Sequence, residues 1–192
     1  MFTGYDDPQH QKWIKELGAE VTFCASDKMT VLVTDKIRRT AKLLCALGRG
    51  IPIVSTSWIT QSKSAKTVLD PTHHLIEDTE TERKYGFSLR KSIQAASKTP
   101  LLQTYKVHAT KSCLPPPDQL KDIVECAGGS WLKQMPKKKA DDVIIISCRE
   151  DKDVLNKAIK AGFNVQDKEF LLTGLLKQQL NFKLYALSTV FD

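Results

Sequence analysis

Four basic residues stand close together in the first half of the chain: Lys36, Arg38, Arg39 and Lys42. Apolar residues recur at three- and four-residue spacing through the same stretch, so residues 36–47 are predicted to form a helix with one buried face. Cations at a helix N-terminus oppose the helix dipole, whereas the dipole and the unpaired backbone N–H groups favour an anion there. The cluster therefore indicates an anion-binding site, and a solvated basic face is the alternative.

Thr3 and Gly4 offer further donors at the end of the first predicted strand. The Thr3 hydroxyl can donate to a phosphate oxygen, and the absence of a side chain at Gly4 lets the backbone N–H approach closely. Lys42 can add a charge-assisted hydrogen bond. A phosphate group carries three strong acceptor oxygens, which such a trio can satisfy. From the residues alone, a strand-end hydroxyl in a turn is the favoured interpretation of Thr3.

Strands and helices alternate along the first half of the chain in the order βαββαβα. The predicted strands are residues 1–4, 20–25, 30–33 and 51–54, and the predicted helices are residues 8–17, 36–47 and a closing helix that carries Trp58. Thr34 and Asp35 are expected to cap the basic helix, and Gly48 is expected to end it.

The same order of elements returns after residue 100. Here the predicted strands are residues 105–109, 130–132, 143–146 and 163–165, and the predicted helices are residues 117–126, 151–161 and 168–176. Gly128 and Gly129 correspond to Gly18 and Ala19 in the first half, and Phe170 stands in the closing helix where Trp58 stood. This is an internal repeat of a whole small domain rather than of a solenoid unit.

The repeat predicts an α/β protein with two three-layer domains in tandem, each with helices flanking a small central parallel sheet. We expect a first repeat at 1–69, an inter-repeat linker at 70–102 and a second repeat at 103–192. In the linker, the acidic run 77–82 is expected to be exposed, and residues 87–93 are expected to form a short amphipathic helix. Because each repeat is near the low end of domain size, the two are expected to share a hydrophobic interface.

The 192-residue chain carries 29 Lys and Arg against 22 Asp and Glu, a net charge of +7, which favours anionic partners. Direct binding of nucleic acid is disfavoured, because Trp13, Trp58, Phe170 and Phe182 are assigned to core-facing positions and leave no platform for stacking bases. No apolar run is long enough to span a membrane, and no signal-peptide pattern is present. We therefore expect a soluble intracellular protein without a membrane partner.

The five cysteines are widely spaced, and no C-x-x-C pair occurs among them. This pattern indicates neither a zinc site nor a disulfide framework, and it suits thiols in a reducing compartment. The four histidines show no ligand spacing, and no motif for an activated nucleophile is present. The sequence therefore predicts a protein without metal, cofactor or catalytic activity.

The order of elements, the glycines after the first helix of each repeat and the aromatic residue of each closing helix resemble BRCT domains arranged as a tandem pair. The resemblance covers essentially the whole chain. It implies a phosphopeptide-binding module without catalysis, whose phosphate pocket lies in the first repeat and is formed by Thr3, Gly4 and Lys42. The second repeat carries His108-Ala109-Thr110 in place of Thr3-Gly4 and has no matching basic pair, so one phosphate site is expected.

The resemblance also implies a pocket between the repeats for the residue three places after the phosphoserine. Arg39 would face this residue, or its carboxylate where the ligand ends there, and Glu169 would hold Arg39 in orientation. Pro116 and Pro117 are candidates for the apolar wall of this pocket, and initiation of the following helix is the alternative role for both.

The same resemblance implies that the chain is part of a mediator or adaptor of the DNA damage response in the nucleus. Its expected ligand is the phosphorylated C-terminal tail of the variant histone on chromatin at double-strand breaks. That tail follows the pattern phosphoserine, glutamine, acidic residue, terminal aromatic residue. The alternatives are a protein–protein module that ignores phosphorylation and a direct DNA-binding domain.

Overall fold

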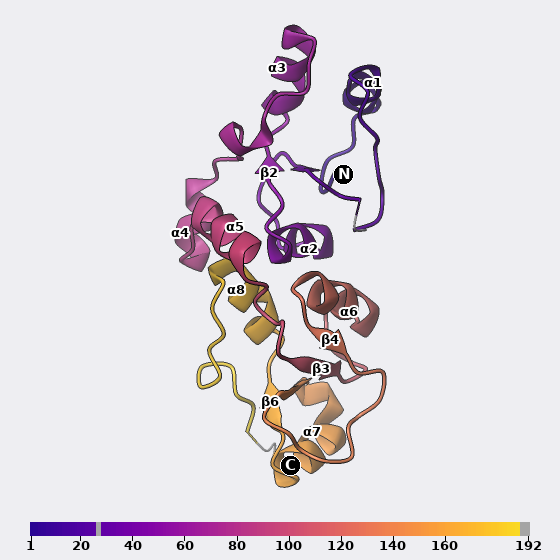
Figure 1. Ribbon diagram of the computed structural model, residues 1–192. Coiled ribbons are helices and arrows are strands. Elements are labelled where there is room, and N and C mark those ends of the chain that lie inside the picture. Colours follow the sequence, from indigo (N-terminus) through magenta and orange to yellow (C-terminus); the bar gives the residue numbers. More distant parts are fainter. Residues whose placement is uncertain (26–27, 189–192) are drawn as a thin grey trace.

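The computed structural model describes residues 1–25 and 28–188. They form an elongated molecule in which the two repeats lie at opposite ends and meet through helices in the middle (Figure 1). The first half contains α1 (Pro8–Glu16), β1 (Leu32–Val33), α2 (Ala41–Gly48), β2 (Ile53–Val54), α3 (Ser57–Ala65), α4 (Thr79–Tyr85) and α5 (Leu89–Lys98). The second half contains β3 (Lys106–Ala109), α6 (Pro117–Cys126), β4 (Ser130–Trp131), β5 (Val143–Ile146), α7 (Lys152–Lys160), β6 (Asn164–Gln166) and α8 (Glu169–Lys177). Short 3₁₀ turns lie at Pro71–His73 and Arg149–Asp151.

The second repeat forms a four-stranded parallel sheet in the order β4-β3-β5-β6. Every side chain of β5 is buried, because the strand is covered on both faces. Ile144 and Ile146 pack into the core that contains α6 and α8, whereas Val143 and Ile145 pack against α7. The predicted three layers and the predicted element order of this repeat are confirmed.

The first repeat has the same layers around a smaller sheet. β1 and β2 pair in parallel, and Phe2 adds a single bridge to Val33. Val33 and Val54 face α1 and α3, whereas Leu32 and Ile53 face α2. The strand predicted at 20–25 is absent, because Phe23 is 67% exposed and this segment has no alternating buried face to hold it against a sheet.

The basic helix begins later than predicted, at Ala41. The Thr40 hydroxyl caps α2 by accepting from the Leu43 backbone N–H at 3.2 Å. The Thr34 hydroxyl instead donates to the Lys36 carbonyl, and the carboxylate of Asp78 accepts from the backbone N–H of Ile37. These bonds hold residues 36–39 in an irregular segment before the helix. Arg39 therefore precedes α2, whereas Lys42 lies in its first turn, so the two residues do not belong to one helix as the prediction over residues 36–47 requires.

The segment between the repeats is folded into α4 and α5. Asp78 caps α4 through the Thr81 N–H at 3.0 Å, and Thr81 is buried, so the acidic run 77–82 is not simply exposed as predicted. The predicted amphipathic helix is present as α5, which buries Leu89 and Ile93. The boundaries 1–69, 70–102 and 103–192 stay a prediction.

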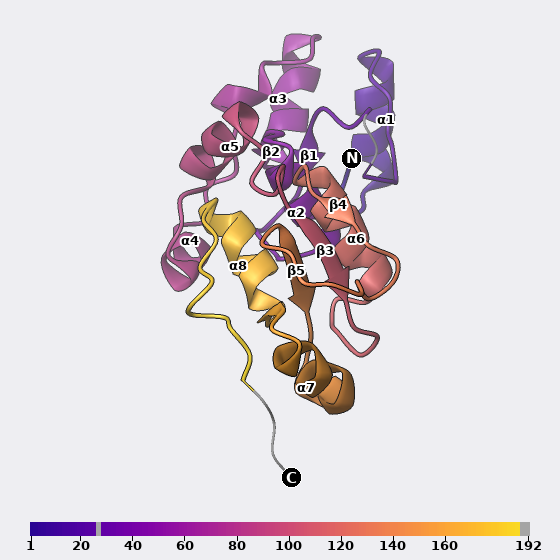
Figure 2. The same ribbon diagram turned by 60° about the horizontal axis from the view of Figure 1, so that its bottom comes forward.

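Helix α2 lies at the centre of the molecule and packs against α5, α6 and α8 (Figures 1 and 2). Its leucines share one continuous buried core with Leu120 and Ile123 of α6 and with Leu171 of α8. Gly48 permits the close approach, since a Cβ there would lie 3.2 Å from the Ala127 backbone nitrogen. The predicted hydrophobic interface between the repeats is confirmed. In the described part of the chain, no helix has the length and apolarity that crossing a membrane requires.

Candidate functional site: the cleft at the start of α2

A cleft of about 1120 Å³ opens at the N-terminus of α2, and we call it the α2 cleft. Its first-repeat wall includes Phe2, Thr3, Gly4, Tyr5, Phe23, Arg39, Thr40 and Lys42. Its second-repeat wall consists of Pro115, Gln119 and Asp122. The structure thus brings four of the predicted site residues together on one surface: Thr3, Gly4, Arg39 and Lys42.

Thr3 is fixed at the edge of the small sheet, because its backbone N–H donates to the Val33 carbonyl at 3.1 Å. Its side chain is only 6% exposed, and its hydroxyl lies 2.9 Å from the Thr40 hydroxyl. Thr40 is a site residue that the sequence analysis did not single out. Its position before an apolar helical pattern was the available signal, since threonine is favoured at an N-cap.

Gly4 has a φ of +63°, a conformation that side chains rarely adopt. A Cβ at this position would lie 2.6 Å from Nη1 of Arg38. Arg38 is neutralised by Asp35, with Nη1 and Oδ1 2.5 Å apart. Lys42, in the first turn of α2, lies with Nζ 3.5 Å from the Phe2 carbonyl oxygen. The positive charge that faces the cleft therefore comes from Lys42 and Arg39.

Arg39 and Glu169 form an ion pair between the two repeats, with Nη1 and Oε2 2.6 Å apart. The guanidinium also stacks over the Tyr85 ring at 4.6 Å, and Glu169 accepts from the Thr173 hydroxyl at 2.6 Å. Burial disfavours the charged forms of both side chains, but the opposite charge and the hydrogen bonds of each side chain stabilise the charged form by more. The pKa of Arg39 is accordingly raised and the pKa of Glu169 is lowered.

The apolar contribution of the second repeat to the α2 cleft comes from Pro115 and not from the two prolines after it. Pro116 is the N-cap of α6, and Pro117 is the first residue of that helix. The structure thus gives Pro116 and Pro117 the helix-starting role, which was the alternative in the sequence analysis. A run of three prolines offered no signal to tell which one faces the cleft.

The corresponding place in the second repeat is built differently. The Thr110 hydroxyl is buried 3.1 Å from the Ser147 hydroxyl, and His108 contacts the Leu132 carbonyl through Nδ1 at 2.9 Å. Asp151 stands at the N-terminus of α7, and its negative charge disfavours a second anion there. This arrangement supports the expectation of one phosphate site.

Comparisons with known proteins agree with this architecture. A family model described as "BRCT domain" matches residues 100–185, and one described as "BRCA1 C Terminus (BRCT) domain" matches residues 2–63. The chain is 38% identical over 188 residues to mediator of DNA damage checkpoint protein 1 of Homo sapiens, covering 98% of this chain and 9% of that protein. It is 33% identical over 198 residues to PAX-interacting protein 1 of Mus musculus, covering 96% of this chain and 19% of that protein.

Two solved structures share the fold across both repeats. The BRCT5-BRCT6 domains of S. pombe Brc1 match with a TM-score of 0.76 and 24% identity, covering 96% of this chain and 94% of that chain. Rtt107p in complex with a phosphorylated histone matches with a TM-score of 0.67 and 12% identity, covering 97% and 90%.

Proposed function

Because this chain belongs to the BRCT family and carries two BRCT domains in tandem, we propose that it binds phosphoserine peptides in the DNA damage response. The observation that carries this proposal is the convergence of Thr3, Gly4 and Lys42 at the start of α2, in one cleft with Arg39. The chain spans a small part of its relatives, so the proposal concerns this pair of domains.

In this proposal, the phosphate group of the peptide binds beside the N-terminus of α2. The helix dipole favours an anion there, and Lys42 supplies a formal positive charge that Asp35 does not neutralise. The Thr3 hydroxyl turns away from Thr40 and donates to one phosphate oxygen. Because Gly4 has no side chain, its backbone N–H can donate to a second phosphate oxygen. Charge-assisted hydrogen bonds of this kind contribute about 1.5–3 kcal/mol each.

In the same proposal, Arg39 binds the C-terminal end of the peptide. Its guanidinium is held by Glu169 and Tyr85, so little rotamer freedom is lost when the peptide binds. A planar guanidinium can take a terminal carboxylate in a bidentate manner, which lysine cannot. A phosphate at one end and a carboxylate at the other would select the C-terminus of a protein.

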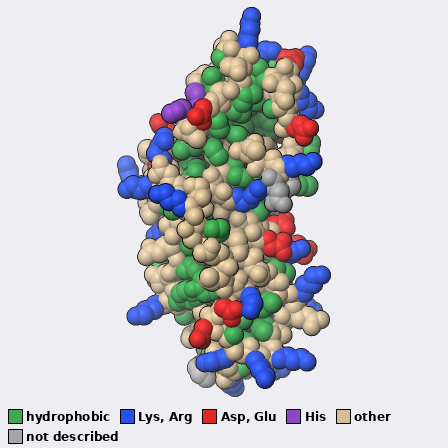
Figure 3. Space-filling view, viewed as in Figure 1, with side chains coloured by type: hydrophobic (Ala, Val, Ile, Leu, Met, Phe, Trp, Pro, Cys, Tyr) green, Lys and Arg blue, Asp and Glu red, His purple; other side chains and the backbone are tan. Residues whose placement is uncertain are grey.

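The proposed ligand is the phosphorylated C-terminal tail of the variant histone at double-strand breaks, and the proposed location is chromatin in the nucleus. Rtt107p, a protein of the same fold, has been solved in complex with a phosphorylated histone, which makes a histone tail the first ligand to test. We further propose that the pair is a binding module and not an enzyme. On the face that Figure 3 shows, Lys and Arg side chains are scattered rather than gathered in one stripe, so this face offers no continuous basic track for nucleic acid.

The test is fluorescence anisotropy with one short peptide that ends in phosphoserine, glutamine, an acidic residue and an aromatic residue. The peptide is prepared with a free C-terminus, with an amidated C-terminus, and without the phosphate. We expect tight binding of the first form only. Equal binding of both phosphorylated forms would support the phosphate pocket but would show that Arg39 does not bind the terminal carboxylate.

Equal binding of the phosphorylated and unphosphorylated peptides would overturn the proposal in favour of a module that ignores phosphorylation. Binding of a DNA duplex that weakens steeply with salt, together with no response to any peptide, would favour the nucleic-acid alternative. A titration at two ionic strengths separates these outcomes.

A further inference from the structure

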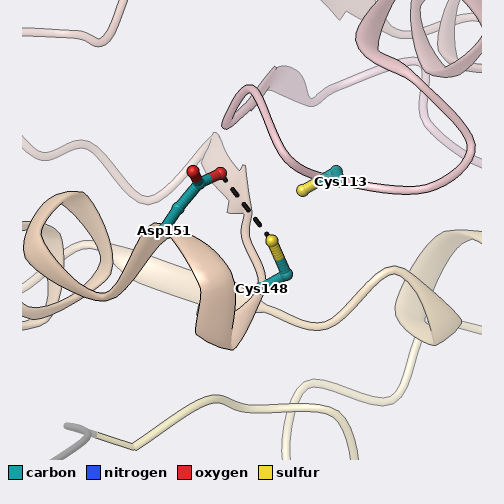
Figure 4. A group of neighbouring side chains, drawn as sticks. All are labelled: Cys113, Cys148 and Asp151. Carbon is teal, nitrogen blue, oxygen red and sulfur yellow. Dashed lines mark hydrogen bonds between the residues drawn. The ribbon is translucent and has the colours of Figure 1, made fainter.

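Two cysteines and an aspartate of the second repeat meet at the end of its parallel sheet (Figure 4). Cys113 follows β3, and Cys148 and Asp151 lie between β5 and α7. The two sulfurs and a carboxylate oxygen all lie within 4.8 Å of one another. Figure 4 shows the three side chains pointing towards a common point.

We propose that Cys113, Cys148 and Asp151 bind a divalent cation of the zinc class. Two thiolates select a borderline or soft metal over Mg²⁺ or Ca²⁺, which prefer oxygen ligands. Zinc–sulfur bonds of about 2.3 Å in a tetrahedral site separate two thiolate sulfurs by about 3.8 Å, so the side chains need to move little. Cys113 and Cys148 also line an open cleft of about 500 Å³, from which a water can supply the fourth ligand.

The carboxylate is already oriented by neighbouring donors. The Ser112 backbone N–H donates to Asp151 Oδ2 at 2.9 Å, and the Ser112 hydroxyl donates to Oδ1 at 2.7 Å. Hydrogen bonds of this kind commonly fix ligating carboxylates in metal sites. The Cys148 thiol lies 3.7 Å from the same Oδ2, so the sulfur and the oxygen already face each other.

Both thiols make hydrogen bonds in the structure. The Cys148 thiol donates to Asp151, and the Cys113 thiol donates to the Ile146 carbonyl at 3.6 Å. Metal binding therefore replaces one proton on each sulfur by a metal–sulfur bond, and two protons pass to the solvent.

The spacing of the two cysteines carries no metal-binding signature, because the fold and not a local motif brings them together. The site stands in the second repeat at the place where the α2 cleft stands in the first repeat, beyond the ends of the strands and beside a helix N-terminus. An acidic residue and two thiols there suit a cation, whereas Lys42 and Thr3 suit an anion. This inference is independent of peptide binding.

The experiment is a titration of the chain with Co²⁺, a spectroscopic substitute for zinc, in a buffer with a phosphine reductant that keeps the thiols reduced. We expect intense visible bands of tetrahedral cobalt and a thiolate charge-transfer band, saturating at one ion per chain. Added Zn²⁺ should remove both bands. Cys113→Ser and Cys148→Ser should abolish the charge-transfer band, and Asp151→Asn should weaken binding at least tenfold.

Cys24→Ser is the matched control, because Cys24 is an exposed thiol outside the cluster, and it should leave the bands unchanged. Since Cys113 is only 2% exposed, its variant could fail to fold. The protection of the cysteines from alkylation by bound Zn²⁺ is therefore measured in the unmodified chain as well. Zn²⁺ should slow alkylation of Cys113 and Cys148, mapped by mass spectrometry, and leave Cys24 reactive. Absent bands, bands retained in Cys148→Ser, or alkylation rates unaffected by Zn²⁺ would overturn the proposal.

Discussion

The guanidinium of Arg39 donates to the carboxylate of Glu169 at 2.6 Å, although 130 positions separate the two residues in the chain. One residue precedes α2 in the first repeat, and the other opens α8 in the second. The side chains are 25% and 29% exposed, so the pair is largely shielded from solvent. The same contact therefore joins the repeats and orients the arginine that faces the α2 cleft.

Replacing Glu169 by glutamine should lower the free energy of unfolding by roughly 1–2 kcal/mol. This range lies between the value of about 0–1 kcal/mol for exposed pairs and about 3–5 kcal/mol for broken buried pairs. Glutamine keeps a hydrogen-bond acceptor but removes the charge opposite Arg39. Urea unfolding followed by circular dichroism measures the change.

The matched control is Glu80→Gln, because Glu80 is a residue of the same type that is exposed on the neighbouring helix α4. It should change the free energy of unfolding by less than about 0.5 kcal/mol. A loss of stability at Glu80 equal to that at Glu169 would show that the loss at Glu169 does not come from its pairing with Arg39.

The stability contribution of Glu169 should depend on pH. Its pKa in the folded protein lies below the ordinary value of 4.5, because the hydrogen bonds from Arg39 and Thr173 outweigh the effect of burial. A carboxylate with a depressed folded pKa stabilises the protein above its unfolded pKa, and this contribution is lost as the pH falls through the folded pKa. The difference in unfolding free energy between the unmodified chain and Glu169→Gln should therefore be constant near neutral pH and shrink below 4.5. A difference that grows in acid would contradict this assignment.

The elements of the second repeat could be predicted closely from the sequence because its signals agree with one another. The buried strand 143–146 is uniformly apolar, and Pro117 and the glycines after Cys126 mark both ends of α6. In the first repeat, Thr34, Asp35 and Thr40 all suit a helix N-cap, so the pattern alone did not decide where α2 begins. The choice depends on a distant contact between Asp78 and the Ile37 N–H, which no local pattern reveals.

In the candidate site, too, some residues could be predicted from the sequence and others depend on contacts between distant parts of the chain. Thr3, Gly4, Arg39, Lys42 and Glu169 could be proposed from the resemblance, and the structure places them around the start of α2 and the junction with α8. The role of Pro115 could not be predicted, because which proline faces the cleft depends on the backbone path into α6. The cluster of Cys113, Cys148 and Asp151 could not be predicted either, since it depends on how β3 and β5 pair.

Replacing Lys42 by methionine should weaken binding of the phosphorylated peptide roughly ten- to hundredfold, as expected for the loss of a charge-assisted hydrogen bond of about 1.5–3 kcal/mol. Methionine keeps most of the aliphatic side chain, so the fold should be retained. Lys36→Met is the control, because Lys36 is exposed in the neighbouring basic segment but does not line the α2 cleft. Anisotropy titrations of both variants, with thermal unfolding as the check of fold, test this. Equal weakening by the two substitutions would indicate general charge attraction instead of a defined pocket.

Replacing Gly4 by alanine should separate the stability of the chain from its ligand binding. Gly4 and Gly18 have φ values of +63° and +83°, so an alanine costs about 1–2 kcal/mol of backbone strain at either position. A Cβ at Gly18 would meet nothing within 4 Å, whereas a Cβ at Gly4 would meet the far end of the exposed Arg38 side chain. Since that side chain can move away, the two variants should lose similar stability.

Their binding should differ, because only Gly4 lines the α2 cleft. The methyl group at Gly4 would meet the Arg38 guanidinium, so Arg38 or the backbone that faces the phosphate has to shift in this variant and not in Gly18→Ala. We expect Gly4→Ala to bind the phosphorylated peptide at least tenfold more weakly than Gly18→Ala. Thermal unfolding and anisotropy on the same two preparations give both quantities. Undiminished binding by a folded Gly4→Ala variant would place the phosphate elsewhere in the cleft.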